Sequence, residues 1–493
     1  MSLPGIFLDI IEGSARPAAA GASKALVIGP SKSGIKENKI YTFANPSDIE
    51  AEIGLGPATT AAQMILSQAP SGFGNVDMIV CSSSLTQSND VVLSDSDAVI
   101  VSTASADNYD VMLEITSAGS RGEAKFRFSL DGGSTYSPSY TTVASYPLAA
   151  HGVTFTFADV SYTTGLKART RIQAAAPNAT DLAACFAVLE TQSTTPTLIL
   201  VATPSDDPEA NEPLFATLDT ALTNLKNVYK YTSAVLPGGG ETKLWNMPQG
   251  EEDGTYDKDD VIGEFSTTAA SEGNFISVVA EKVRTSIPLP KIGYSRPRLP
   301  FAFTVATELH RLANDHSSLL PRSIAYVSDP SYDDFANGTV YHPEFLIAPR
   351  SWPGEANLAV NQALLKSAEG STFDVWPKGK VTNVAANAAR VALRRFVNTR
   401  VRVNPDGTGT IDARDAATIE ATVNSALNDV LVTVLNGQGN PGHVSAIGFF
   451  VNRNNNILTT GLLQGTLAIV PLAYVKNIQA TISLELELPV QAA

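Results

Sequence analysis

Residues 404–415 carry oxygen-bearing side chains at the spacing of a calcium-binding loop. The positions are Asn404, Asp406, Thr408, Asp412 and Asp415, with Gly409 in the sixth place. An EF-hand loop uses such intervals to surround the ion with oxygen ligands. Asn at the first position and a short Asp at the last leave three carboxylates, Asp406, Asp412 and Asp415, which predicts weak binding. The same residues are also typical of a tight turn that feeds an N-capped helix, and this is the interpretation we favour.

The segment Gly29–Gly34 follows an apolar run, as a phosphate-binding loop would. The Walker pattern requires Gly immediately before its Lys, so that the backbone can wrap the phosphates. Here Ser31 occupies that position, and no helix clearly starts on the loop. We therefore predict no nucleotide site.

Candidates for catalysis are scattered along the chain. Five histidines occur without the i, i+4 spacing of a helical metal site: His151, His310, His316, His342 and His443. No nucleophile elbow of the Gly-x-Ser-x-Gly type is present. Adjacent acidic pairs lie in loops rich in Pro and Gly: Asp206-Asp207, Glu251-Glu252 and Asp333-Asp334. We predict no catalytic residue, no bound cofactor and no enzymatic activity.

The charge balance argues against nucleic acid as a partner. The chain has 34 Lys and Arg against 49 Asp and Glu, a formal net charge of −15. Binding to phosphates needs a basic surface instead. The basic residues that do cluster are expected to pair with the acidic excess: Arg390, Arg394, Arg395, Arg400 and Arg402.

The two cysteines, Cys81 and Cys185, each lie in an apolar run and are expected to be buried free thiols. No basic segment precedes the first apolar residues, so we expect no secretory signal. The most apolar window, residues 457–475, is interrupted by Gly, Gln and Pro and is not expected to span a membrane. These features predict synthesis in the cytosol without direct insertion into a membrane.

The first part of the chain shows an α/β pattern. A chain of 493 residues suggests roughly three or four domains. Residues 24–81 are predicted as the first part of an α/β domain, with buried strands at Lys24–Gly29 and Val76–Cys81. Helices are expected from Asn45 and over Thr59–Gln68.

Residues 82–176 are predicted as an inserted, all-β, sandwich-like outer module. The segment is rich in Ser, Thr and Tyr, and short alternating strands are expected at Val111–Thr116, Ala124–Leu130 and Val153–Phe157. An Asp-Gly pair within Phe126–Ser134 predicts a tight β-hairpin.

Helical patterns resume in residues 177–380, the second part of the α/β domain, which includes a Gly-rich, acidic loop at 237–260. The expected elements are helices at Thr180–Leu189, Glu212–Tyr229 and Phe301–Leu312, and a strand at Thr197–Val201. The whole is predicted as a multidomain α+β and α/β protein with a mixed-sheet core.

Residues 381–476 are predicted as a C-terminal domain with a helix over Val381–Asn398 and another beginning after Asp412. Asp412 is the expected N-cap, and Asp415 would complete a carboxylate capping box. One face of this helix is apolar: Ile419, Val423, Leu427, Val430 and Val434.

Both termini are predicted to be extended arms, residues 1–23 and 477–493. The first carries the apolar residues Ile6, Phe7, Leu8 and Ile10. The second alternates strictly, with one apolar face that includes Ile478, Ile482, Leu484, Leu486 and Leu488. Such alternation predicts a half-buried β-strand, which must pair within its own chain or with a neighbouring one.

Two sets of motifs carry a resemblance to a known family. The first set is Ala25–Pro30, Ile53–Gly56 and Met78–Cys81. The second covers nearly all of residues 400–490: Val401–Pro405, Thr410–Ala416, Ile419-Glu420, Gly442–Ala446, Val451–Thr460 and Val470–Ile478. In this order they resemble the sheath proteins of contractile phage tails, most closely the Mu-like branch. One departure is Asn452-Arg453-Asn454, where the family pattern has Asp-Arg-Thr.

The resemblance implies a structural subunit that polymerises helically around a tail tube and contracts to drive the tube through a bacterial envelope. It implies that the two arms add strands to sheets of neighbouring subunits. Implied partners are other copies of the chain, the tube, the baseplate and the tail terminator, in a virion tail assembled in the host cytoplasm. The C-terminal domain would lie nearest the tube, with Asp412, Arg414, Asp415 and Ile419 as possible tube-facing residues.

Two alternatives stay open. The sequence does not separate a virion sheath from that of a phage-derived contractile injection system or bacteriocin. From another class, the 82–176 module could be part of a carbohydrate-binding surface protein. The absence of a signal segment and the aromatic content of 7% argue against that second alternative.

Overall fold

The computed structural model describes most of the chain between Lys24 and Tyr474. The described residues are 24–31, 37–70, 74–85, 93–94, 99–103, 107–149, 151–240, 258–267, 274–287, 298–312, 315–318, 320, 323–328, 330–336, 339–434 and 442–474. Both predicted arms, with all their proposed linkage residues, lie outside these ranges.

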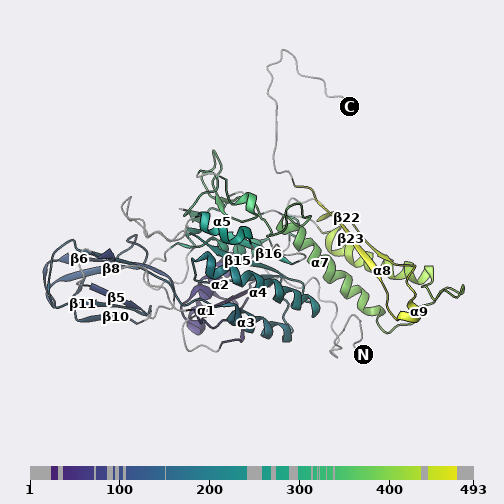
Figure 1. Ribbon diagram of the computed structural model, residues 1–493, viewed down its shortest axis with the longest axis horizontal. Coiled ribbons are helices and arrows are strands. Elements are labelled where there is room, and N and C mark those ends of the chain that lie inside the picture. Colours follow the sequence, from purple (N-terminus) through teal and green to yellow (C-terminus); the bar gives the residue numbers. More distant parts are fainter. Residues whose placement is uncertain are drawn as a thin grey trace, which may run out of the picture.

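A six-stranded sheet lies at the centre of the molecule, in the order β16-β15-β14-β1-β3-β2 (Figure 1). Its strands are β1 (Ala25–Gly29), β2 (Ile40–Phe43), β3 (Val76–Val80), β14 (Leu198–Val201), β15 (Ser233–Gly239) and β16 (Phe275–Ala280). Neighbouring strands are parallel except for β2, which runs antiparallel to β3. Parallel neighbours need long crossovers, and helices supply several of them here.

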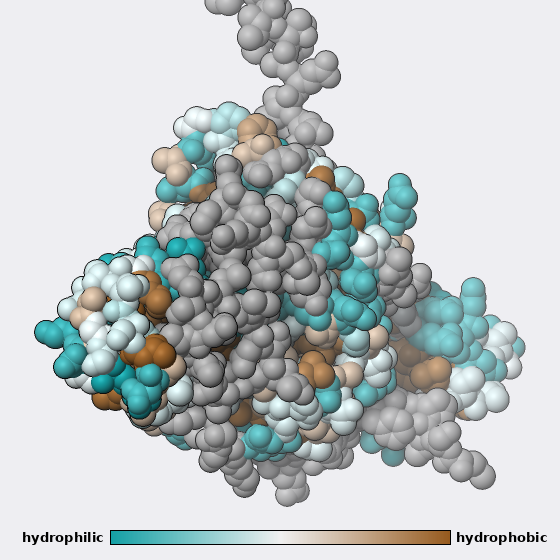
Figure 2. All heavy atoms as spheres, turned by 60° about the vertical axis from the view of Figure 1, so that its left-hand side comes forward, coloured by the Kyte–Doolittle hydropathy of each residue, from teal (hydrophilic) through white to brown (hydrophobic). Residues whose placement is uncertain are grey.

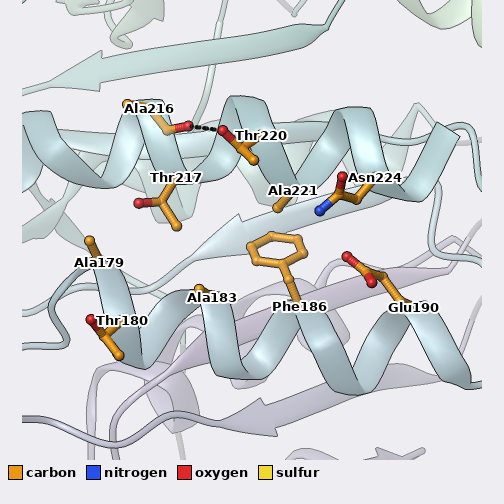
Figure 3. A pocket seen from close by; sticks show the side chains of 10 residues that line it. All are labelled: Ala179, Thr180, Ala183, Phe186, Glu190, Ala216, Thr217, Thr220, Ala221 and Asn224. Carbon is orange, nitrogen blue, oxygen red and sulfur yellow. Dashed lines mark hydrogen bonds between the residues drawn. The ribbon is translucent and has the colours of Figure 1, made fainter. Parts of the chain in front are cut away.

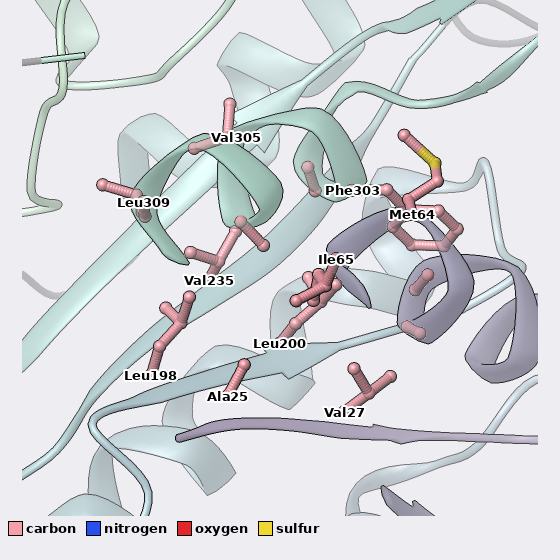
Figure 4. Close-up of a cluster of buried hydrophobic side chains, with 14 of the residues drawn as sticks. Ala25, Val27, Met64, Ile65, Leu198, Leu200, Val235, Phe303, Val305 and Leu309 are labelled. Atoms are coloured by element: carbon pink, nitrogen blue, oxygen red, sulfur yellow. The ribbon is translucent and has the colours of Figure 1, made fainter. Parts of the chain in front are cut away.

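Both faces of this sheet are covered, which explains why β1 is continuously apolar. The covering helices are α1 (Pro46–Ile53), α2 (Pro57–Ser67), α3 (Ala179–Thr191), α4 (Pro208–Asn227), α5 (Lys258–Thr267) and α6 (Phe301–Arg311). Ala25 and Val27 face a core shared with α2 and α6 (Figure 4). Leu26 and Ile28 face a second core, shared with α3, α4 and α5.

A β-rich region lies between β3 and α3 in the sequence and extends to one side of the central sheet (Figure 1). Its strands are β4 (Leu93–Ser94), β5 (Val99–Thr103), β6 (Tyr109–Ser117), β7 (Gly119–Ser120), β8 (Lys125–Ser129), β9 (Tyr140–Thr141), β10 (Ser145–Leu148), β11 (Val153–Phe157), β12 (Ser161–Tyr162) and β13 (Lys167–Ile172). They form a five-stranded sheet, β4-β13-β6-β8-β9, a three-stranded sheet, β10-β11-β5, and the pair β12-β7.

The β-rich region has an aromatic core of its own. Phe126 and Phe128 from the five-stranded sheet meet Phe155 and Phe157 from the three-stranded sheet, with ring centroids 4.7–6.2 Å apart. All four side chains are buried. On the face turned forward in Figure 2, hydrophilic and hydrophobic side chains alternate in small patches over the coloured atoms.

The predicted tight hairpin within Phe126–Ser134 is wrong. A turn exists at Asp131, where Gly132 and Gly133 have positive φ angles of 69° and 92°. The next strand along the chain that pairs with β8 is β9, which begins only at Tyr140. The Asp131 carboxylate explains the longer excursion, because it accepts hydrogen bonds from Thr135 N and Thr135 Oγ1, at 2.9 and 2.8 Å, and so holds the chain in a wider loop.

The boundaries predicted for the acidic loop 237–260 are also wrong at both ends. Residues up to Gly239 belong to β15, because Pro237 and Gly239 continue its pairing with β16 across a bulge. The last residues of the predicted loop belong to α5, which begins at Lys258. Residues 241–257 lie outside the described part of the chain.

Smaller elements complete the central part after β16. They are β17 (Lys282–Thr285), β18 (Leu299–Pro300), β19 (Val327–Ser328), a short 3-10 helix at His342–Glu344, β20 (Pro349–Arg350) and β21 (Ala359–Val360). Cys81 and Cys185 are both buried and free, as predicted. Across the residues with described structure, no helix is long and apolar enough to cross a membrane.

The C-terminal part forms a separate core from two helices and two strands. It consists of α7 (Trp376–Leu393), a 3-10 turn at Arg394–Phe396, α8 (Ala413–Leu431), β22 (Val444–Val451), α9 (Ile457–Thr460) and β23 (Gly465–Pro471). The helix α7 begins five residues before the predicted Val381, with Pro377 in its first turn, where proline is well tolerated. The core of the C-terminal part contains Ile419, Val423, Leu427 and Leu431 of α8.

Candidate inter-subunit interface

The strands β22 and β23 form a two-stranded antiparallel ribbon on the outside of α8 (Figure 1). One face of the ribbon packs on the helices: Phe449 and Val451 are buried, and Leu467 and Ile469 are half-buried against the same core. An isolated two-stranded ribbon is marginally stable in water, and packing on helices supplies the missing stabilisation. The ribbon is therefore a fixed part of the subunit.

The opposite face of the ribbon is apolar and open to solvent. Phe450 is 58% exposed and Val470 is 53% exposed, at opposite ends of this face. Leu458 of α9, in the connection between the two strands, is 72% exposed. These are the three most exposed large apolar side chains in the described part of the protein. An apolar face that the subunit itself leaves uncovered marks an interaction site.

The free edge of β22 is partly occupied by polar side chains of α8. The Asn424 side chain accepts a hydrogen bond from Phe449 N at 2.7 Å. Glu420 Oε1 accepts one from Val451 N at 2.8 Å. These two backbone groups point away from β23, as alternate residues of an antiparallel strand must. An added strand would have to displace both side chains from this edge.

Among the described residues, no side chain hydrogen-bonds to the free edge of β23 at Leu467 or Ile469. Leu467 lies directly opposite Phe449 and Ile469 lies opposite Ile447, so their backbone N–H groups also point away from the partner strand. Within the described residues, β23 pairs with β22 alone. An open edge of this kind is a template for another strand. Pro471 ends the template, because it has no N–H to donate.

Two Arg–carboxylate pairs join the N-terminal half of α8 to neighbouring segments. Glu420 accepts from both terminal nitrogens of Arg453, at 2.8 and 2.9 Å, and this hydrogen bonding lowers the pKa of Glu420. Asp415 accepts from Arg402 N at 2.6 Å and from its guanidinium, which lowers the pKa of Asp415. These pairs orient the ribbon and the turn before α8; both arginines lie at the surface.

The predicted capping box at the start of α8 is half right. Asp412 is the N-cap and accepts from Arg414 N at 2.9 Å. Asp415 does not return a hydrogen bond to the cap, because its carboxylate is engaged by Arg402. On the predicted apolar face, Val434 is exposed and Leu431 takes its place in the core.

The three calcium-ligand candidates do not converge. Asp406 accepts from Thr408 N and Thr408 Oγ1, at 3.0 and 2.6 Å, within its own turn, and the hydroxyl bond lowers its pKa. Asp412 caps α8 and Asp415 binds Arg402. Within the described part of the chain, no group of three His, Cys, Asp or Glu side chains is placed to hold a metal ion. The loop is a tight turn feeding a capped helix.

Of the predicted tube-facing residues, Arg414 is exposed and Asp412 and Asp415 are half-buried. Ile419 is 2% exposed in the core beneath the ribbon, so its prediction as a surface residue is wrong. Sequence reasoning also missed Phe450, Val470, Asn424 and Glu420. The alternation of β22 and β23 carried a signal for the first two, whereas the other two depend on how α8 packs.

A groove of about 480 Å³ lies between α3 and α4 on the other side of the molecule. Its lining is mainly small side chains, with Phe186 directed towards α4 between them (Figure 3). Thr220 Oγ1 donates to Ala216 O at 3.0 Å within its own helix. Glu190 is the one charged group in this lining, and the other polar side chains there are Thr180, Thr217, Thr220 and Asn224.

Comparison with known proteins gives structural matches only. No protein-family model matches the chain. No curated protein matches it by sequence. A chain from the sheath complex of an extracellular contractile injection system, PVC, in its contracted state superposes with a TM-score of 0.52 at 10% identity, covering 99% of this chain and 98% of that one.

Two further matches come from the anti-feeding prophage, AFP. A chain from its baseplate in the contracted state gives a TM-score of 0.51 at 10% identity, covering 99% of both chains. A chain from the sixfold-symmetrised baseplate gives 0.50 at 11% identity, covering 99% of this chain and all of that one. At these identities the likeness concerns the fold. The protein has, over nearly its whole length, the fold found in the sheath complex of a contractile injection system.

Proposed function

We propose that this protein is a sheath subunit that polymerises helically around a tube and contracts to drive the tube through a bacterial envelope. The observation that carries the proposal is the match of fold along nearly the entire chain to a PVC sheath complex. The proposal covers a phage tail and a phage-derived injection system alike. In either case the partners would be other copies of the chain, the tube, the baseplate and the terminator, in a tail assembled in the host cytoplasm.

The ribbon supports a specific form of linkage between subunits. We infer that a strand from another copy adds to the free edge of β23, while the α8 side chains keep the β22 edge closed. The two arms, residues 1–23 and 477–493, are the proposed sources of that strand. Each backbone hydrogen bond would contribute about 1 kcal/mol, and burial of the Phe450 and Val470 face would add roughly 25 cal/mol per Å².

Other parts of the chain have subordinate roles in the proposal. Residues 82–176 would form an outer module, and Asp412, Arg414 and Asp415 remain candidates for the surface that faces the tube. The carbohydrate-binding alternative gains no support from the phenylalanines of this module. Phe126, Phe128, Phe155 and Phe157 fill its core and are not available to stack on a sugar.

The test is electron microscopy of the purified full-length chain at high concentration, beside a matched chain that ends at Lys476. We expect long hollow tubes from the full chain and only single subunits from the truncated one. Tubes from both would keep the sheath function and remove the C-terminal arm from the linkage. Single subunits from the full chain, with and without added tube protein as a template, would contradict the sheath function itself.

A further inference from the structure

Two histidines meet inside the joint between the central part and the C-terminal part. His316 follows α6, and His443 immediately precedes β22. Their ring centroids are 4.9 Å apart. His443 is completely buried, with its Nδ1 atom 3.0 Å from Ser317 Oγ and 3.5 Å from Asp315 Oδ1. Within the described residues, His316 Nδ1 and His443 Nε2 are buried without a hydrogen-bond partner.

Three other elements close around these rings. Lys380 of α7 donates its Nζ protons to Leu312 O at 2.6 Å and Asp315 O at 3.0 Å. Tyr474, just after β23, donates its hydroxyl to Ser317 O at 3.0 Å. The segment 315–317 is thus held by α7, by the residue before β22 and by a residue after β23. Contacts at both ends of the ribbon, from His443 and Tyr474, therefore reach the central part at the same short segment.

The charged groups around the two histidines include a cation that disfavours a second positive charge. Lys380 is one cation in the cluster, and Asp315 is the carboxylate that faces both it and His443. Asp374 lies near Tyr474 but pairs with Lys378, at 2.6 Å. A proton on His316 would add a second cation beside Lys380 in a partly buried site, which is unfavourable.

The pKa shifts agree with this geometry. Burial, with the charge of Lys380 next in effect, lowers the pKa of His316 to about 3. Burial lowers the pKa of Lys380 to about 8, so it stays cationic at neutral pH. Burial raises the pKa of Tyr474 to about 12, so its hydroxyl stays protonated. Because His316 binds a proton near pH 6.5 once exposed, the closed joint loses stability as the pH falls from about 6.5 towards about 3.

We propose that this cluster is an acid-sensitive latch, which holds the C-terminal part against segment 315–317 at neutral pH and releases it in mildly acidic solution. Protonation of His316 separates it from Lys380, and the neighbouring His443 and Tyr474 contacts to segment 315–317 are lost with it. Since His443 and Tyr474 bracket the ribbon in the sequence, β22 and β23 are freed together. The latch is a property of the single subunit and does not depend on the sheath function.

Hydrogen exchange of the full-length subunit tests the latch, with rates corrected for the intrinsic effect of pH. Peptides from 442–451 and 467–474 should lose protection by roughly tenfold or more between pH 7.5 and pH 5.0, whereas peptides from β6 and β8 should not. His316→Phe keeps a ring in the site but cannot bind a proton, so it should lose most of this acid effect. His342→Gln, at a histidine outside the cluster, should retain it.

Two further variants make the outcome decisive. His316→Gln provides a second way to remove the titrating ring, if His316→Phe does not fold at neutral pH. Lys380→Met removes the neighbouring cation, which raises the pKa of His316 in the closed joint, so the acid-induced loss of protection should level off at a higher pH than in the wild type. An acid effect of equal size in the wild type and in both His316 variants would overturn the proposal. So would unchanged protection of the joint peptides in the wild type at pH 5.0.

Discussion

The β-rich region and the β22–β23 ribbon are both antiparallel, but they treat their apolar side chains differently. In the β-rich region two sheets cover each other, and Phe126 and Phe155 are fully buried between them. The ribbon has helices on one face only and leaves Phe450 and Val470 more than half exposed on the other. The first arrangement is complete within one chain. The second leaves one face and one edge uncovered by the described residues, which is why we propose that a neighbouring subunit covers them.

The two regions also differ in how their edge strands are protected from pairing with other strands. In the β-rich region, β9 and β10 are short edge strands, a common way to prevent unwanted pairing. In the ribbon, α8 side chains cover the edge of β22 at two backbone positions, while β23 pairs on one side only among the residues that the structure describes. A subunit that protects one edge and exposes the other directs strand addition to a single place.

The largest expected effect is on the stability of the β-rich region. Phe126→Ala removes a ring that contacts several other aromatic side chains. Such a change in a packed core costs about 3–5 kcal/mol, which we expect in the opening free energy of β6 and β8 measured by hydrogen exchange. Val160→Ala, at a side chain 45% exposed, is the matched control and should change it by less than about 0.5 kcal/mol. A loss below about 1 kcal/mol for Phe126→Ala would mean that the two sheets do not form one core.

For the ribbon we expect a smaller effect, which concerns assembly and not the stability of the subunit. Phe450→Ser should change the stability of the subunit by less than about 0.5 kcal/mol, because the ring is mostly exposed. If a neighbour covers this face, the lost burial is worth about 2 kcal/mol per contact. That raises the protein concentration needed for tube formation roughly 30-fold, as measured by sedimentation.

Val160→Ser in the β-rich region is the control for Phe450→Ser, since it replaces another exposed apolar residue far from the ribbon. It should form tubes at the wild-type concentration. Equal behaviour of the two variants would show that the open face of the ribbon has no special role in assembly, and the comparison between the two regions would fail.

Strands covered on both faces were well predicted from sequence, because the signal is local. Residues 25–28 are buried on both sides of the sheet, which gives a continuous apolar run. The start of α7 was missed because Trp376 and Pro377 were not recognised as a helix N-terminus. The prediction of a tight hairpin was wrong for another reason. The Asp-Gly pair does form a turn, but the Asp131 side chain accepts a hydrogen bond from Thr135 N and so holds a wider loop.

The interface was less predictable, because its parts depend on long-range contacts. Asp415 has the right spacing for a capping box, yet Arg402, thirteen residues earlier, binds its carboxylate. Nothing in the local pattern of α8 indicates that Asn424 and Glu420 close the edge of β22. The exposed face of the ribbon was readable from the alternation of its strands. Which edge is open required the packing of α8.

The most direct test of strand addition is a cryo-EM reconstruction of the assembled tubes at a resolution that separates β-strands. We predict an extended segment of a neighbouring subunit beside β23, hydrogen-bonded to the backbone at Leu467 and Ile469, with Phe450 and Val470 covered. The Asn424 and Glu420 contacts to β22 should be intact. Tubes in which the β23 edge faces solvent, or in which the added strand lies along β22, would contradict this account.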